Sequence, residues 1–183
     1  MDAQNVCEEI KKVNHRDMIP AMLKQIGLNN TQIEIGVWKG DNLWLMHEAG
    51  PKRLIGIDLW AEATYPRENG EGLYERVLAR FNQTAVTILR GSSVKQSESF
   101  APESVDYVYL DAGHTYDDII SDITAWWPKI RSGGMLAGHD YAIGPAHRNR
   151  GVIEAVDEFR ESNNHALFHT TKEKNCSWMV LKN

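Results

Sequence analysis

The sequence has few cysteines, no long apolar run and no surplus of positive charge, and each of these shortages excludes a class of protein. Its 183 residues include two cysteines, Cys7 and Cys176, and neither lies in a Cys-x-x-Cys or Cys/His cluster. Two scattered thiols do not form a disulfide framework or a zinc site, and they are typical of a reducing, cytoplasmic setting. No apolar run reaches the roughly 18 residues that cross a bilayer, so we expect no membrane partner.

Charge and composition are those of an ordinary globular protein. The net charge is −5, whereas a general nucleic-acid binder normally carries a basic face, so nucleic acid is not expected as a partner. Hydrophobic residues make up 42% of the chain and charged residues 25%, which predicts one domain spanning residues 1–183. Within it we expect an N-terminal helical segment at 3–26, broken near Pro20, and a core at 30–183.

Strand-like and helix-like segments alternate along the core. Short β-branched apolar runs predict strands, and longer runs with polar capping residues predict helices. Strands are expected at 31–36, 53–60, 85–91, 104–111 and 133–141, helices at 41–50, 116–130 and 151–162, and a closing antiparallel pair at 165–171 and 176–182. This alternation predicts an α/β fold with a mainly parallel sheet and helices on both faces.

The five predicted parallel strands all end in polar residues. In parallel α/β sheets, ligands bind outside the carboxyl ends of the strands. The ends read Glu34-Ile-Gly36, Asp58-Leu59-Trp60, Gly91-Ser92-Ser93, Asp111-Ala-Gly113-His114 and His139-Asp140-Tyr141. Five polar ends at one edge of the sheet indicate a ligand site more strongly than any single motif does.

The first two strand ends favour a nucleoside that carries a cationic group. The stretch EIGVWKG places Gly36 and Gly40 between a strand and a helix, but it is neither the Gly-x-Gly-x-x-Gly dinucleotide fingerprint nor a phosphate-binding loop. Asp58 follows roughly twenty residues later, where nucleoside-binding α/β folds hold ribose hydroxyls. Glu34 beside the glycines would repel a pyrophosphate and tolerate a sulfonium, which favours S-adenosylmethionine over NAD.

Several stretches resemble the successive motifs of class I S-adenosylmethionine-dependent methyltransferases: EIGVWKGDN, IGIDLW, RGSS, YLDAGHTYDDIISDI, and SGGMLAGHDY followed by GVIEAVDEF. They look closest to the small domains resembling macrocin O-methyltransferase and cephalosporin hydroxylase. The resemblance implies a Rossmann-like methyltransferase fold, with a seven-stranded sheet whose last strand is antiparallel. It also implies S-adenosylmethionine as the cofactor and O-methylation of a small-molecule hydroxyl as the activity.

The resemblance also implies where the cofactor lies. Its methionine part would lie against the first glycine loop, its ribose hydroxyls against Asp58, and its adenine near Leu59 and Ser92. Trp38 could stack on the ligand or serve only in packing. The residues expected to bind the cofactor are Glu34, Gly36, Trp38, Gly40, Asp58, Leu59, Ser92, Ser93 and Asp111.

Four residues at two strand ends are the candidates for chemistry. Methylation of a hydroxyl needs a base or a metal ion to remove the proton. Asp111, His139 and Asp140 end strands that should be neighbours, and they suit Mg²⁺ or Mn²⁺ as metal ligands. Related metal-dependent enzymes of the catechol and caffeoyl-CoA types carry Asp-x-x-Lys at the first of these ends, so His114 stands where their general base lies. We therefore expect His114 and His139 as catalytic residues.

Other interpretations stay open beside these. The stretch YLDAGHTYDD also predicts a helix start, with Thr115 and Asp118 as a capping box. His139 could instead hydrogen-bond a backbone group, and Asp140 could cap the following loop. A cofactor-binding protein of the same fold without methyl transfer is an alternative function, and an NAD-dependent oxidoreductase is a weaker one.

Two polar loops are candidates for acceptor recognition. Residues 61–72 are rich in Pro, Gly and Glu, and residues 142–151 carry His147, Arg148 and Arg150. The basic cluster favours an anionic acceptor or a sugar, although a solvated surface loop explains it as well. Because the chain has little material beyond the core sheet, a second subunit could complete the acceptor pocket in a homo-oligomer.

Overall fold

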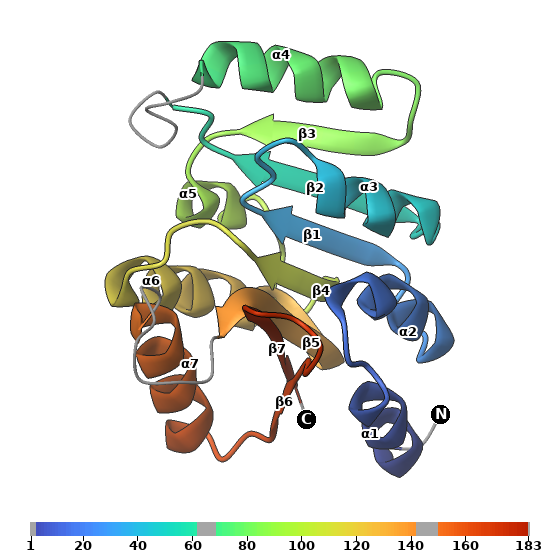
Figure 1. The fold of residues 1–183 in the computed structure, drawn as a ribbon, viewed down its shortest axis with the longest axis vertical. Helices are drawn as coiled ribbons and strands as arrows, with labels where there is room; N and C mark the ends of the chain where they lie inside the picture. The colour runs from blue at the N-terminus through green and yellow to red at the C-terminus, as the bar shows by residue number, and fades with distance from the viewer. Residues whose placement is uncertain (1–2, 62–68, 142–149, 183) are drawn as a thin grey trace.

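A seven-stranded sheet runs through the computed structural model, which describes residues 3–61, 69–141 and 150–182 (Figure 1). The strands are β1 (Thr31–Ile35), β2 (Arg53–Asp58), β3 (Val86–Arg90), β4 (Val105–Leu110), β5 (Ile130–Tyr141), β6 (Leu167–His169) and β7 (Cys176–Leu181). Their order across the sheet is β3-β2-β1-β4-β5-β7-β6. The pairings among β1 to β5 are parallel, and β7 is antiparallel to both β5 and β6. The predicted fold, mainly parallel with a reversed last strand, is confirmed.

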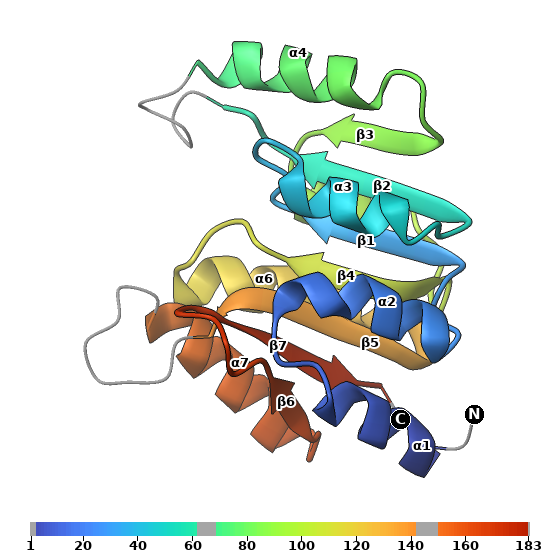
Figure 2. The same ribbon diagram turned by 45° about the vertical axis from the view of Figure 1, so that its right-hand side comes forward.

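Helices cover both faces of the sheet, as Figures 1 and 2 show. One face carries α1 (Ala3–Lys11), the 3-10 turn η1 (Arg16–Met18), α2 (Ile19–Gln25), α3 (Asp41–Glu48) and α4 (Gly70–Phe81). The other carries α5 (Ser93–Ser97), α6 (Tyr116–Trp126), the 3-10 turn η2 (Trp127–Lys129) and α7 (Arg150–Ser162). Among the described residues, every helix is too short or too polar to span a bilayer.

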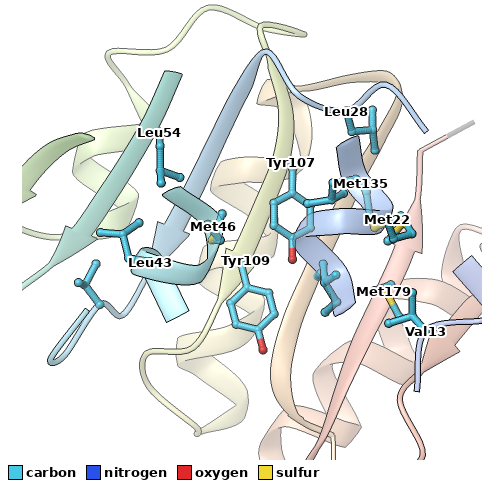
Figure 3. Packing of buried hydrophobic residues seen from close by; sticks show 14 of the residues in the cluster. Val13, Met22, Leu28, Leu43, Met46, Leu54, Tyr107, Tyr109, Met135 and Met179 are labelled. Atoms are coloured by element: carbon cyan, nitrogen blue, oxygen red, sulfur yellow. The ribbon is translucent and has the colours of Figure 1, made fainter. Parts of the chain in front are cut away.

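The two faces bury two separate apolar clusters because successive side chains of a strand point to opposite sides of the sheet. On β4, Tyr107 and Tyr109 join the cluster under α1 to α4, where Figure 3 shows them with Met46. Val108 and Leu110 of the same strand join the cluster under α6 and α7. All of β4 is buried, as expected for a central strand covered on both sides. The two cores fix the central strands and therefore the position of their carboxyl ends.

The N-terminal helical segment expected at 3–26 is broken at a different position from the one predicted. The break lies at residues 12–15, between α1 and η1, and not near Pro20. Pro20 is buried in the first turn of α2, where a missing backbone N–H has no intrahelical partner to lose. This places residues 12–15 in an irregular link that runs toward the carboxyl edge of the sheet.

Helix α4 was not expected from the sequence, which placed residues 70–72 in a polar loop. The side chain of Asn69 accepts a hydrogen bond from the N–H of Gly72 and caps the helix. Leu73, Val77 and Phe81 then bury one stripe of α4 against the sheet. Of the two loops predicted to recognise the acceptor, residues 62–68 and 142–149, with His147 and Arg148, lie outside the described residues, whereas Arg150 and Gly151 belong to the first turn of α7 and not to a loop.

Candidate active site

A cavity of about 980 Å³ opens at the carboxyl ends of the central strands. It lies where the strand order reverses between β1 and β4, the usual ligand position in such sheets. One predicted residue, Gly40, lies outside the lining, because it caps α3 and faces the ring of Phe81. The cavity brings together the other predicted residues: Glu34, Gly36, Trp38, Asp58, Leu59, Ser92, Ser93, Asp111, His114, His139 and Asp140.

Gly36 lets the loop after β1 pass directly against the end of β4. Its φ of +87° lies in the left-handed region, and a Cβ at this position would collide with the backbone carbonyl of Asp111. Its N–H donates to the carbonyl of Ile57 at 2.9 Å, which ties the same loop to β2. Only glycine satisfies both the dihedral angle and the close approach.

Asp58 holds the two loops that border one end of the cavity. Its Oδ2 accepts a hydrogen bond from the N–H of Trp38 at 2.8 Å, and its Oδ1 accepts one from the N–H of Trp60 at 2.9 Å. Both tryptophans have a positive φ, 50° and 41° respectively, so the buried carboxylate stabilises two strained turns. An ionised carboxylate only accepts hydrogen bonds, which is the chemistry that the hydroxyl groups of a diol require of a partner.

Large apolar side chains stand exposed at the rim of the cavity. Trp38 is 45% exposed, Leu59 48% and Val94 41%, although most apolar side chains of this size are buried elsewhere in the chain. All three line the cavity. An apolar rim above a floor of carboxylates is suited to an aromatic ring attached to a polar group.

Glu34 is a fully buried acid with one unsatisfied oxygen. Its Oε1 accepts a hydrogen bond from the side chain of Asn42 at 2.7 Å, whereas its Oε2 has no hydrogen-bond partner among the described residues. Burial raises the pKa of Glu34 to about 8, and the hydrogen bond from Asn42 opposes that rise. A cationic donor entering the cavity would favour the ionised form of Glu34, whose Oε2 could then accept its hydrogen bond.

A partly buried chain of hydrogen bonds links Ser93, Asp122 and Trp126 at the cavity wall. The hydroxyl of Ser93 donates to Oδ1 of Asp122, and the indole N–H of Trp126 donates to the Ser93 oxygen at 3.1 Å. Burial raises the pKa of Asp122 to about 6, and the bond from Ser93 lowers it. Asp122 lines the cavity and was not predicted as a site residue, because its place in the middle of α6 looks like an ordinary polar helix position.

His114 and Asp140 form a hydrogen-bonded pair at the ends of β4 and β5. Nε2 of His114 lies 2.8 Å from Oδ2 of Asp140, and the side chain of Asn175 donates to Oδ1 at 2.6 Å. Asp140 has a φ of +61°, a strained conformation for a residue that is not glycine. Burial raises the pKa of Asp140, but bonds to His114 and His139 outweigh it and hold that pKa well below its usual value. The bond to Asp140 in turn raises the pKa of His114.

His139 lies beside this pair and faces three carboxylates. Its Nδ1 is 3.8 Å from Oδ1 of Asp111 and 3.6 Å from Oδ2 of Asp140, and its Nε2 is 3.7 Å from Oε2 of Glu173. Ligand atoms of Asp111, His139 and Asp140 all lie within 4.8 Å of one another. Two carboxylates and an imidazole at this spacing are a donor set that fits Mg²⁺ or Mn²⁺.

The helix start predicted beside these residues is confirmed. Thr115 caps α6, accepting a hydrogen bond from the N–H of Asp118 at 3.2 Å, and the Asp118 side chain accepts one from the N–H of Thr115 at 3.3 Å. This reciprocal capping box fixes the first turn of α6. It therefore also fixes the short loop from Asp111 to His114 that precedes the helix.

Comparison with known proteins places the chain in a family. A family model described as a methyltransferase domain matches residues 33–141. The chain belongs to this methyltransferase family. The matched region runs from within β1 to the end of β5 and includes every residue that was predicted for chemistry.

Curated relatives of this methyltransferase are distant. Protein y4gI of Sinorhizobium fredii is 24% identical over 131 residues, and protein R132 of Acanthamoeba polyphaga mimivirus is 26% identical over 124 residues. These matches include 55% and 61% of the chain. They span 14% and 51% of the respective relatives, so both relatives are considerably longer than the shared region.

Solved methyltransferases share the fold at low sequence identity. The O-methyltransferase TomG of Streptomyces achromogenes, in complex with S-adenosylmethionine, is 16% identical, with a TM-score of 0.65 over 92% of this chain and 79% of that chain. An O-methyltransferase of Bacillus cereus, in complex with S-adenosylhomocysteine, is 14% identical, with a TM-score of 0.65 over 98% of this chain and 88% of that chain. At these identities the likeness establishes the fold alone.

Proposed function

We propose that this methyltransferase uses S-adenosylmethionine to methylate a hydroxyl oxygen of a small molecule. One observation carries the proposal: a single cavity joins a nucleoside-like subsite, with Asp58 and the apolar rim, to the hydrogen-bonded pair of His114 and Asp140. Similar solved structures are O-methyltransferases in complex with S-adenosylmethionine or S-adenosylhomocysteine. The absence of a Gly-x-Gly-x-x-Gly fingerprint in the sequence argues against NAD as the natural ligand.

The cavity fits the cofactor at three points. The unsatisfied Oε2 of Glu34 suits the ammonium group of the methionine part. The carboxylate of Asp58, which lines the cavity, suits the ribose hydroxyls, and Leu59 and Val94 offer apolar surface for adenine. When bound, S-adenosylmethionine supplies a methyl group that its sulfonium makes electrophilic.

His114 is the proposed general base. Ionised Asp140 favours the tautomer in which Nε2–H of His114 donates to Oδ2, which leaves the lone pair on Nδ1. Nδ1 takes the proton of the acceptor hydroxyl while the oxygen forms its bond to the methyl carbon. On transfer, the electron pair of the carbon–sulfur bond would remain on the sulfur of the demethylated cofactor. Asp140 stabilises the imidazolium that forms, as a buried carboxylate does for any histidine base.

Asp111, His139 and Asp140 are proposed to hold a divalent cation. Such a cation would supply positive charge that makes an acceptor hydroxyl easier to deprotonate. Glu173 faces the Nε2 side of His139, and a carboxylate there orients the ring so that Nδ1 points to Asp111 and Asp140. His139 therefore contributes as a ligand and not as a second base.

Methyl transfer to a panel of catechols, sugars and hydroxy acids tests the proposed function. The product is scored by mass, with and without EDTA and with Mg²⁺ or Mn²⁺ added back. We expect transfer to at least one hydroxyl acceptor and loss of most of it in EDTA. Activity that is unchanged both by EDTA and by Asp140→Ala would remove the metal from the proposal. Cofactor binding with no transfer to any acceptor would favour a binding protein of the same fold.

A further inference from the structure

A second cavity of about 550 Å³ adjoins the first. Arg16 and His139 line both cavities, so they stand at the boundary between them. The other lining residues come from two segments far apart in the sequence, 15–17 and 172–175. A molecule in the second cavity would reach the cluster around His114 past the side chains of Arg16 and His139.

The backbone at Arg16 is fixed to the chain between β6 and β7. The carbonyl of Asn14 accepts hydrogen bonds from the N–H groups of Thr171 at 3.1 Å and Lys172 at 2.8 Å. The N–H of Arg16 itself donates to Oε1 of Glu173 at 2.7 Å. These three bonds fix the irregular link after α1 to residues 171–173, so the backbone of Arg16 is held in place.

The guanidinium group of Arg16 is close to the chemistry and has unused donors. It lies 3.8 Å from Oδ2 of Asp111, which is an ion-pair distance and too long for a hydrogen bond. Among the described residues, no hydrogen bond is made by this guanidinium, and its side chain is 34% exposed. A planar fork of N–H donors on a fixed backbone is the group that best recognises a carboxylate or a phosphate.

Other charges of the second cavity agree with an anionic ligand. Lys172 and Lys174 line it from the chain between β6 and β7, and both are exposed. Of the two acids there, Glu173 already accepts the Arg16 N–H and faces His139, so its charge is partly compensated. The other acid that lines the second cavity is Asp17.

We propose that Arg16 binds an oxyanion group of the methyl acceptor, so that the acceptor carries a carboxylate or a phosphate near its reacting hydroxyl. That the bound anion is the methyl acceptor rests on the proposed function; that Arg16 binds an anion does not. Arg16 is then a specificity-determining residue that neither its sequence position nor any motif marks.

Binding of small aromatic probes tests the inference without depending on the acceptor's scaffold. The full chain, saturated with S-adenosylhomocysteine, is titrated with benzoate, with benzamide as its neutral match, and with phenyl phosphate, each followed by NMR chemical shifts. We expect at least one anionic probe to bind about tenfold or more tighter than benzamide. A stronger response to benzoate assigns a carboxylate acceptor, and a stronger response to phenyl phosphate assigns a phosphate ester.

Variants of Arg16 decide whether this residue causes the preference. Arg16→Gln should abolish it, and Arg16→Lys, which keeps the charge but loses the fork, should weaken anion binding about threefold or more. Arg76→Gln is the matched control, since it removes the same charge from an exposed position on α4 outside both cavities. If Arg16→Gln fails to fold, Arg16→Lys alone carries the test.

Failure of the inference is distinguishable from failure of the proposed function. Equal binding of benzamide and the anions, or an anion preference that survives Arg16→Gln, would overturn the role of Arg16 even if the chain binds S-adenosylhomocysteine. No binding of S-adenosylhomocysteine by the unaltered chain would instead overturn the proposed function. As a kinetic readout, Arg16→Gln should raise KM for an anionic acceptor more than it lowers kcat.

Discussion

His114 and Asp140 come from the ends of neighbouring strands, and Nε2 of the imidazole lies 2.8 Å from Oδ2 of the buried carboxylate. Asn175 donates to the other carboxylate oxygen, so Asp140 is held from both sides. The pair opens into the cavity that also contains the proposed cofactor residues. This relationship turns a general likeness to methyltransferases into a specific account of which nitrogen takes the proton.

Replacing His114 should slow methyl transfer and leave the affinity for the cofactor nearly unchanged. We expect His114→Gln to lower kcat by about 10² to 10⁴, the usual contribution of a positioned base. The affinity for S-adenosylhomocysteine should change by less than about threefold, because His114 is not among the residues proposed to bind the cofactor and its substitution removes an interaction made only during transfer. Single-turnover methyl transfer and calorimetry measure the two effects. Full activity in His114→Gln would remove this residue as the base.

Asp58 should be required for both cofactor affinity and the stability of two loops. In Asp58→Asn, an amide N–H₂ would replace one oxygen that accepts a backbone N–H from Trp38 or Trp60. A buried donor facing another donor costs about 1 to 3 kcal/mol, so the free energy of unfolding should fall by that amount. Urea unfolding measures it, with Glu75→Gln on the exposed face of α4 as the control. An unchanged midpoint would contradict the bonds assigned to Asp58.

Because the pKa of Glu34 is raised, we expect the affinity for the cofactor to depend on pH. Its pKa of about 8 means that the free protein holds a proton there at pH 7, and binding of a cationic ammonium group favours the ionised form. Binding therefore releases a proton, and affinity should rise severalfold per pH unit until about pH 8. Nearby Asp111 and Asp58 raise this pKa, and Arg16 lowers it. Calorimetry at pH 6, 7 and 8 should show the trend, and Glu34→Gln should flatten it.

The same proton affects the stability of the free protein in the opposite direction. Between pH 4.5 and about 8 the folded chain binds a proton at Glu34 that the unfolded chain has released. The contribution of Glu34 to the free energy of unfolding of the free protein should therefore fall as pH rises through that range. Glu34→Gln should remove this contribution, so the difference in melting temperature between variant and parent should grow in favour of the variant as pH rises. A difference that is constant with pH would contradict a raised pKa.

Gly36 and Gly27 form a matched pair for backbone strain. Both have a positive φ, but a Cβ at Gly27 meets nothing within 4 Å, whereas one at Gly36 collides with the backbone of Asp111. Gly27→Ala should destabilise by about 1 to 2 kcal/mol, which is the cost of the left-handed conformation alone. Gly36→Ala should destabilise by at least about 2 kcal/mol more, since β4 must shift. Equal losses in urea unfolding would mean that the loop relaxes away from β4.

Much of the fold could be predicted because the sequence alternates apolar strands with capped helices. The sequence alone therefore predicts that the strand ends at Asp58, Asp111 and Asp140 lie at one edge of the sheet. Helix α4 was missed although Leu73, Val77 and Phe81 recur at helical spacing. Its glycines at the start and the polar residues before it suggested a loop, and burial of the apolar stripe outweighs that local preference.

The parts of the site that were missed depend on tertiary contacts without a sequence signal. Arg16 reaches Asp111 because residues 14–16 dock onto the chain between β6 and β7, at the other end of the sequence. Glu173 and Asn175 come from the same connection. No spacing rule links such residues, because they meet only when β6 brings the C-terminal chain to the carboxyl edge, where β7 begins beside the end of β5. Gly40, by contrast, was predicted from spacing and lies outside the cavity.

A calorimetric titration with S-adenosylhomocysteine, repeated with NAD, tests the central claim most directly. We expect saturable binding of S-adenosylhomocysteine at a single site, at least about tenfold weaker binding in Asp58→Asn, and no comparable binding of NAD. Tight binding of NAD without binding of S-adenosylhomocysteine would contradict it, because the cavity at the strand ends would then serve a different chemistry.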